Sequence, residues 1–401
     1  SYDKESGELV LHNYMDFDNL KDYVKISYEL TQDGLLIGKG KLAEVSVVPH
    51  SEGKTNLQVN VPENGKCYLK LTYHLKKEMP LLEEDYILGF DEIEVSQKDA
   101  KCQLAEKWVE KTVTDSELQV SEDDTQIHIK GREFAYTIDR RTALFTEMKF
   151  AGREYLNHPM ELNIWRAPTD NDMYIKSEWK KAHYDKAYTR AYTTEVVQGK
   201  HGVKITSHAS VVAETVQKIL DVTITWKIEA AGKIDADIAV TKDDEFPDLP
   251  RFGVRMFLDK KLSAARYFGM GPQESYCDKH QAASHGLYHA NVDDLHEDYI
   301  RPQENGSHYD CEYVELNNSR YGIVVSAENA FSFNASYYTQ EELEEKTHNY
   351  ELIESDSVVF CVDYALNGIG SNSCGPVVLE QYRFDDVLFR FQFTLIPYVK
   401  G

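Results

Sequence analysis

The sequence has too little positive charge for a protein that binds nucleic acid. Its 401 residues include 44 Lys and Arg against 68 Asp and Glu, which gives a formal net charge of -24. A field of this sign repels phosphate backbones and anionic lipid. We therefore expect no nucleic-acid partner and no membrane-surface role. The charge fits a protein that handles a neutral ligand, although solubility alone would also account for it.

Paired cysteines and long apolar runs are also lacking. The six cysteines are scattered, with no CxxC spacing, which predicts reduced thiols in a cytoplasmic protein. No stretch is long and apolar enough to cross a bilayer, and the opening SYDKESGELV lacks the pattern of a signal peptide. The first residue is Ser rather than Met, so we expect a piece of a longer chain.

What the sequence does have is strand-forming residues. The chain holds 26 Tyr and 16 Phe among many Val, Ile and Thr, which favours an all-β fold. Over residues 1–98, short alternating segments recur about every ten residues, and Asp33-Gly34 between two of them predicts a hairpin. Seven or eight such strands, including 43–48 and 55–61, predict a small immunoglobulin-like β-sandwich.

The rest of the chain predicts a second, larger β domain. A polar stretch over 99–120 is expected to be a linker, and alternation then continues across 121–401. This length of strand without strand–helix alternation predicts one large antiparallel β-sandwich and excludes a (β/α)8 barrel. Helix is predicted only at 177–191 and 339–348.

Four loops rich in Gly, Pro, Asn and carboxylates interrupt the strands. Their sequences are WRAPTDNDMY (165–174), YFGMGPQESYCDKH (267–280), EDYIRPQENGSHYD (297–310) and NGIGSNSCGP (367–376). Binding groups usually sit on loops that a rigid sheet holds in place. These residue types are also ordinary turn formers, so composition alone does not separate the two roles.

The order of these motifs carries a resemblance to a known family. WRAPTDND, GMGPQESYCDKH, YIRPQENG and GIGSNSCGP, with LPRFGVRM before the second, resemble the C-terminal domain of LacZ-type β-galactosidases of glycoside hydrolase family 2. LVLHNYMDFDNL with YELTQDGLLIGKG is similar to the immunoglobulin-like domain that precedes it there. The resemblance covers essentially the whole chain.

The resemblance implies that this chain is the last two domains of a five-domain, retaining enzyme. That enzyme hydrolyses terminal β-D-galactose from β-galactosides such as lactose, with two catalytic Glu in a central barrel. We therefore expect no catalytic residue, metal or cofactor in this chain, although the parent enzyme uses Mg and Na near its barrel. The implied partners are the N-terminal domains and barrel, or a separate large subunit, in a homo-oligomer.

In the family, the final domain lends loops to the rim of the sugar pocket. Tyr174 replaces a glycine of the best-known member, and Cys374 stands near the place of a Trp in some members, which predicts weaker stacking of the leaving sugar. The matching residues, taken as the pocket rim, are Asp170, Asn171, Asp172, Met173, Tyr174, Asn372, Ser373 and Cys374.

Other titratable residues receive structural roles. Glu274 and Glu304 could be read as an acid and nucleophile pair, but we expect both to hydrogen-bond loop backbone. We expect Arg166 to pair with Asp170 or Asp172, and Asn305 to be a structural loop residue. A catalytic thiol at Cys374 is disfavoured, because no His lies nearby in the sequence.

A histidine group adds one metal hypothesis. His285 and His289 have the i,i+4 spacing that suits a metal only on a helix, and the strand-like sequence LYHANV argues against a helix there. We therefore assign no metal to this pair or to the neighbouring His280 and His296.

Two further readings stay open. The chain could be a stand-alone carbohydrate-binding sandwich, with Trp108, Trp165 and Trp179 as aromatic platforms and Trp226 in the core. Alternatively, it could serve assembly alone, through apolar surface left where a barrel packs.

Overall fold

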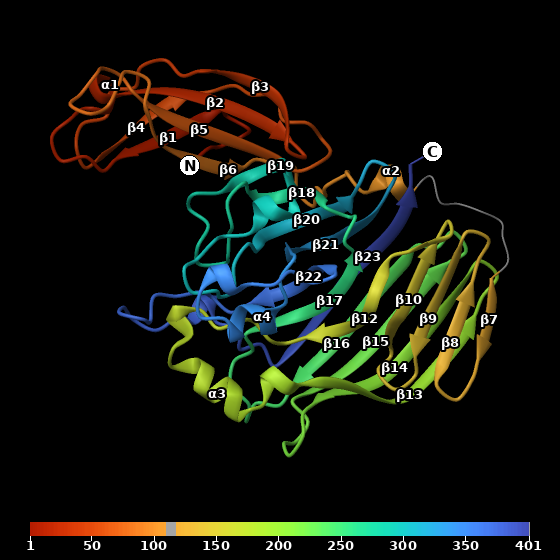
Figure 1. Cartoon of the computed structure of the whole chain (residues 1–401). Helices are drawn as coiled ribbons and strands as arrows, with labels where there is room; N and C mark the ends of the chain where they lie inside the picture. Colours follow the sequence, from red (N-terminus) through yellow and green to blue (C-terminus); the bar gives the residue numbers. More distant parts are fainter. Residues whose placement is uncertain (110–117, 401) are drawn as a thin grey trace. The chain divides into compact units, whose positions relative to one another are not determined.

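The computed structural model describes residues 1–109 and 118–400 (Figure 1). The chain forms two compact units, the first of Ser1–Leu104 with His285–Leu287 and the second of the remaining described residues. Residues 110–117 of the predicted linker 99–120 lie outside the described residues. Both units are built from antiparallel strands, so the predicted all-β fold class is confirmed.

The first unit contains a two-stranded and a four-stranded sheet. β1 (Glu8–Asn13) pairs with β4 (Ser51–Asn56), and the larger sheet has the order β3-β2-β5-β6. The bounds of the larger sheet's strands are β2 Val24–Gln32, β3 Leu35–Lys41, β5 Cys67–Leu75 and β6 Ile87–Glu94, and the one short helix is α1 Leu20–Tyr23. The two sheets share a hydrophobic core that includes Leu9, Leu30 and Leu69.

The predicted hairpin is confirmed, whereas two predicted strands are wrong. Asp33 and Gly34 join β2 to β3 with φ of +47° and +75°, the positive values that a type I′ turn requires. No strand forms at 43–48, and β4 ends before most of 55–61, which leaves six strands in place of seven or eight. Val47 is buried, but its backbone bonds to the side chains of Asn13 and Asn19 and to the N–H of Leu20, and to no backbone group of a neighbouring strand. The segment 43–48 therefore has the alternating burial of a strand, but its backbone forms no hydrogen-bond ladder with another strand.

The second unit contains a five-stranded and a twelve-stranded sheet (Figure 1). The five-stranded sheet has the order β11-β10-β9-β8-β7, with bounds β7 Gln119–Glu122, β8 Gln126–Lys130, β9 Phe134–Asp139, β10 Leu144–Phe150 and β11 Arg153–Glu154. The main path of the larger sheet is β12-β17-β22-β21-β23-β16-β15-β14-β13, and β18, β19 and β20 extend it from β21.

The strands of the larger sheet span most of the chain after residue 155. Their bounds are β12 Leu156–Asn163, β13 Tyr188–Gln198, β14 Gly202–Val212, β15 Leu220–Glu229, β16 Ile234–Lys242, β17 Arg251–Asp259, β18 Ala264–Gly271, β19 Ser284–Asn291, β20 His308–Asn317, β21 Tyr321–Ser336, β22 Ser357–Leu366 and β23 Leu388–Val399. Alternating side chains of β14, β15 and β16 are buried, as the sequence pattern predicts.

One continuous core joins the two sheets of this unit. Trp226 on β15 is fully buried, packs edge-on against Phe145 of β10 at 4.9 Å between ring centroids, and donates its indole N–H to the carbonyl of Ala143 at 2.8 Å. The core role predicted for Trp226 is therefore confirmed. An aromatic side chain of this size, with its one polar atom satisfied, fixes the small sheet on the large one.

Helix is scarce among the described residues, and one predicted helix is too long. α3 spans Ile175–Lys181 and covers only the first five residues of the region predicted as 177–191, and the chain has entered β13 by Tyr188. His183 has a left-handed φ of +59°, which ends the helix. The remaining helices are α2 Glu106–Val109 and α4 Gln340–Glu345, with 3₁₀ turns η2 Asp170–Asp172, η3 Tyr184–Lys186, η4 Val292–Leu295, η5 Asn349–Glu351 and η6 Glu380–Tyr382. None of the helices in the described part of the chain has the length and apolar character needed to span a membrane.

Candidate functional site

The four loops singled out in the sequence are joined by side-chain contacts within the second unit. We name them the DND loop (165–174), the PQES loop (267–280), the PQEN loop (297–310) and the GIGSN loop (367–376). The DND loop follows β12, the PQES loop begins in β18, the PQEN loop leads into β20, and the GIGSN loop follows β22. Antiparallel strands of one sheet thus bring segments up to about 200 residues apart into contact.

Arg166 lies at the centre of this loop cluster. Its Nε donates to Oδ2 of Asp172 at 3.1 Å and its Nη2 to Oδ1 at 2.7 Å, and both side chains are buried. The remaining guanidinium N–H groups reach the GIGSN loop, at the carbonyls of Asn367 (2.5 Å) and Gly368 (3.2 Å). The predicted ion pair therefore forms with Asp172 and not with Asp170, and it ties the DND loop to the GIGSN loop.

Asp172 also shapes the turn that carries the proposed rim residues. Its Oδ2 accepts from the backbone N–H of Thr169 at 2.9 Å and from the Thr169 hydroxyl at 3.2 Å, which closes a capping box around η2. Asp172 is consequently buried, whereas Asp170 is exposed and its N–H donates to Gln303 of the PQEN loop at 3.0 Å. Asp172 is thus a structural centre of this loop and does not face solvent.

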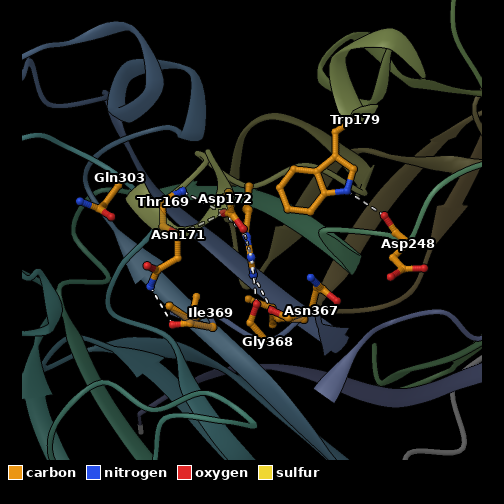
Figure 2. Close-up of polar contacts among 12 residues, drawn as sticks. Thr169, Asn171, Asp172, Trp179, Asp248, Gln303, Asn367, Gly368 and Ile369 are labelled. Atoms are coloured by element: carbon orange, nitrogen blue, oxygen red, sulfur yellow. Dashed lines mark hydrogen bonds and ion pairs between the residues drawn. The ribbon is translucent and has the colours of Figure 1, made fainter. Parts of the chain in front are cut away.

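Asn171 connects the two proposed rim loops directly (Figure 2). Its Nδ2 donates to the carbonyl of Gly370 at 2.7 Å, and its Oδ1 accepts from the N–H of Ser373 at 3.2 Å. Both ends of one amide are therefore used on the GIGSN loop. The outer faces stay open, because Met173 and Tyr174 are 43% and 60% exposed and Cys374 is an exposed free thiol.

Glu304 belongs to a buried charge cluster. Arg251 donates to Glu304 at 3.0 Å and to both oxygens of Asp363 at 3.0 and 2.5 Å, and all three side chains are buried. Burial raises the pKa of Glu304, although Arg251 acts against that rise. We predicted that its carboxylate bonds loop backbone; its partner in the structure is the Arg251 side chain, and only its own N–H bonds the DND loop, at Ala167.

Glu274 sits in a different surrounding. It accepts from the hydroxyl of Tyr299 at 2.5 Å and from the N–H of Gly306 at 2.9 Å, and it pairs with Lys279. Burial works to raise the pKa of Glu274, but Lys279, Tyr299 and Gly306 together hold it below the ordinary value. The hydrogen bond to loop backbone expected of Glu274 is therefore present.

Asn305 holds the PQEN loop together from within. Its Oδ1 accepts from the N–H of Glu297 at 3.0 Å, its Nδ2 donates to the carbonyl of Gln303 at 2.8 Å, and its own carbonyl accepts from Asn334 on β21. Both ends of the side-chain amide and the carbonyl of this buried residue thus bond protein. The contacts are those of a structural loop residue.

The histidine group shows no metal-ligand geometry. His285 and His289 both lie on β19, an extended strand, so four residues separate them by about 13 Å, too far for both to reach one metal ion as they could on a helix. No group of three or more His, Cys, Asp or Glu side chains in residues 1–109 and 118–400 is placed to hold a metal ion.

Three residues with contacts at the cluster have no role predicted from the sequence. Gln303 accepts from the N–H of Asp170 in the DND loop, and the Asn367 side chain accepts from the N–H of Phe384, which lies outside the four loops. Asp278 accepts from the N–H groups of Ile369 at 2.9 Å and Gly370 at 2.7 Å. The contacts of Asp278 join segments more than 90 residues apart in the chain. A local motif carries no signal for such a pairing.

Comparison of the sequence with known protein families matches most of the chain to β-galactosidases. Residues 130–395 match the family described as β-galactosidase small chain, and residues 9–96 match β-galactosidase domain 4. The chain belongs to the β-galactosidase small chain family.

Curated relatives agree with this membership. A β-galactosidase of Actinobacillus pleuropneumoniae is 42% identical over 97% of this chain, and one of Staphylococcus xylosus is 30% identical over 98%. The chain spans 38% and 39% of the length of these two relatives. The solved galactose 1-epimerase of Lactobacillus acidophilus NCFM aligns with 72% of the chain at a TM-score of 0.40 and 8% identity, a likeness too low to support any inference.

Proposed function

We propose that this chain is the non-catalytic C-terminal part of a β-galactosidase, a retaining enzyme of glycoside hydrolase family 2 that releases terminal β-D-galactose. The fraction of the relatives' length that it spans supports this reading, since 38% of a chain leaves room for a complete catalytic domain elsewhere. Retaining hydrolysis needs two carboxylates about 5 Å apart. Glu274 and Glu304, the two weighed for that role, are occupied by Lys279 and Arg251 respectively.

We further propose that the DND and GIGSN loops form part of the rim of the sugar pocket. The observation that carries this proposal is the bidentate use of the Asn171 amide on the GIGSN loop, which makes the two loops one surface element. This element offers the apolar side chains of Met173 and Tyr174 beside the polar groups of Asp170 and Asn372. Such a mixture suits a sugar, which has apolar faces and hydroxyl edges.

A stand-alone sugar-binding module is the weaker alternative. Such modules stack sugars on exposed aromatic rings, but Trp165, Trp179 and Trp226 are buried. Trp165 donates its indole N–H to Glu344, and Trp179 donates its own to the carbonyl of Asp248 (Figure 2), so both have structural contacts. The proposed partners of the chain are accordingly the N-terminal domains and barrel of the same enzyme, in a cytoplasmic homo-oligomer, with lactose-like β-galactosides as substrates.

Reconstitution tests the proposal. The chain alone, the missing N-terminal part alone and their mixture are assayed with lactose and with a nitrophenyl β-galactoside. We expect turnover only in the mixture. A mixture made with the Arg166→Ala chain serves as a matched control, because loss of Arg166 removes the contacts that join the two loops. Robust hydrolysis by the unmixed chain would overturn the proposal.

A further inference from the structure

The backbone of the GIGSN loop is held by side chains from other loops in place of a strand ladder. Arg166 bonds the carbonyls of residues 367 and 368, and Asn171 bonds the carbonyl of 370 and the N–H of 373. Between them lie the N–H groups of Ile369 and Gly370, and both are bonded by Asp278. Backbone polar groups outside regular structure need such partners, so these three side chains specify the path of the loop.

Asp278 is the anionic member of this set, and its carboxylate is committed to the loop. Oδ1 accepts from Ile369 at 2.9 Å and Oδ2 from Gly370 at 2.7 Å, so each oxygen bonds one N–H. No Lys or Arg of the described ranges 1–109 and 118–400 forms an ion pair with Asp278. Hydrogen bonds from neutral N–H groups to an ionised carboxylate are stronger than bonds between neutral groups.

The loop sequence is fitted to this carboxylate. A Cβ added at Gly368 would lie 2.8 Å from Oδ2 of Asp278, closer than real Cβ contacts allow. Gly370 has a φ of +67°, a left-handed value that glycine adopts without strain. The two glycines of GIG therefore let the chain turn tightly over Asp278, and the turn leads directly into Asn372, Ser373 and Cys374.

We infer that Asp278 is a positioning residue that presets the GIGSN loop for the leaving-sugar side of a β-galactoside. The inference rests on the proposed function for the identity of the ligand, but not for the preset loop itself. A loop fixed before binding loses little conformational freedom when the sugar arrives. Asp278 thereby acts on affinity for the leaving sugar through the loop and touches no reacting atom.

The test compares Asp278→Asn and Asp278→Ala in the full-length protein. Asn keeps the shape of the side chain and one acceptor oxygen, but its NH₂ group then faces the N–H of Ile369 or Gly370 and cannot accept from it. Ala removes both acceptors. The matched control is Asp123→Asn, since Asp123 also accepts two backbone N–H groups, those of Thr125 and Gln126, in the turn between β7 and β8.

The first readout is independent of any enzymatic activity. Peptide-resolved alkylation by iodoacetamide reports on the exposed Cys374, and amide hydrogen exchange reports on residues 366–376. We expect both rates to rise about two- to tenfold in Asp278→Asn, more in Asp278→Ala, and not in Asp123→Asn, as the loss of a hydrogen bond allows. Unchanged rates in Asp278→Ala would overturn the inference, whatever the enzyme does.

The second readout separates the leaving sugar from galactose. We expect the KM for lactose to rise about two- to tenfold, while the inhibition constant of galactose and the kcat for a nitrophenyl galactoside stay within about twofold. Equal changes for lactose and galactose would overturn the assignment to the leaving-sugar side, and so would a loosened loop with an unchanged KM for lactose. If the wild-type full-length protein had no galactosidase activity at all, the proposed function would fail and the first readout would still decide the role of Asp278.

Discussion

Arg166 and Asp172 form a two-bond ion pair that is closed off from water, with side chains 0% and 3% exposed. The pair lies within one loop, yet the same guanidinium bonds the carbonyls of Asn367 and Gly368 about 200 residues later. One buried cation thus satisfies a carboxylate and two carbonyls that have no strand partner. The planar fork of Arg is suited to this arrangement, and Lys could not reproduce it.

Breaking this pair is expected to cost much of the stability of the second unit. Asp172→Asn leaves the Arg166 charge buried without its hydrogen-bonded counter-charge, and we predict a loss of about 3 to 5 kcal/mol in the free energy of unfolding. Urea unfolding of the chain measures the loss. The control is Asp237→Asn, because Asp237 pairs with Arg390, whose side chain is 62% exposed, and we predict about 0 to 1 kcal/mol there. Equal losses in the two variants would contradict this account of the pair.

Buried His308 predicts a pH dependence of stability. Its ring packs against those of Tyr267 and Phe333, at 4.5 and 5.0 Å between ring centroids, and Nε2 has no hydrogen-bond partner in the described part of the chain. Burial lowers the pKa of His308 to about 4, although the carbonyl of Met270 and the charge of Glu274 act against the shift. Between this pKa and its ordinary value of about 6.5, the unfolded chain binds the proton and the folded chain does not. The stabilisation is therefore complete above pH 6.5 and is lost as the pH falls toward 4.

We predict that His308 alone contributes about 2 kcal/mol to the loss of unfolding free energy between pH 7.5 and pH 5. His308→Phe removes the titrating group and keeps a flat ring in the stack. The free energy of unfolding is measured at pH 7.5 and at pH 5 for the wild type and for His308→Phe, and the two changes with pH are compared. A change of equal size in both proteins would show that His308 does not carry the effect.

Cys374 predicts a difference in leaving-sugar affinity. A thiol offers no aromatic face, so Cys374→Trp in the complete enzyme should improve stacking of the leaving sugar. We expect the KM for lactose to fall about threefold or more, with the inhibition constant of galactose changed by less than about twofold, as for one added aromatic contact. Val197→Trp, at an exposed position of β13, is the control. Equal effects of Cys374→Trp on lactose and on galactose would contradict a role in leaving-sugar binding.

Local sequence predicted local structure well. The hairpin at Asp33-Gly34 follows from turn chemistry, and the strands β14, β15 and β16 follow from alternation, and both act between neighbours in the chain. The failure at 43–48 has a physical reason, because a segment can bury Val47 without pairing its backbone with another strand. The prediction of a helix beyond Lys181 is wrong. The polar residues of this segment suit a helix, but they also suit β13, which is an edge strand of the large sheet.

The loop cluster was predicted in outline only. The four loops, and the pairing of Arg166 with one of two nearby carboxylates, could be predicted because the partners lie within six residues. The partners of Asp278, Asn171 and Glu304 could not, because they are set by which strands of a twelve-stranded sheet lie side by side. For such contacts the residue types indicate that a side chain can form hydrogen bonds, and the topology of the sheet determines its partners.

The most direct test of the central claim is to trap the catalytic intermediate and locate it. The assembled enzyme is treated with a 2-deoxy-2-fluoro-galactosyl fluoride, which leaves a galactosyl group on the nucleophilic carboxylate of a retaining enzyme. Peptide mass spectrometry then reports which carboxylate carries the label. We predict one label per active site, on a Glu of the part that precedes this chain, and none on residues 1–401. A galactosyl group on Glu274, Glu304 or any other carboxylate of this chain would contradict the account.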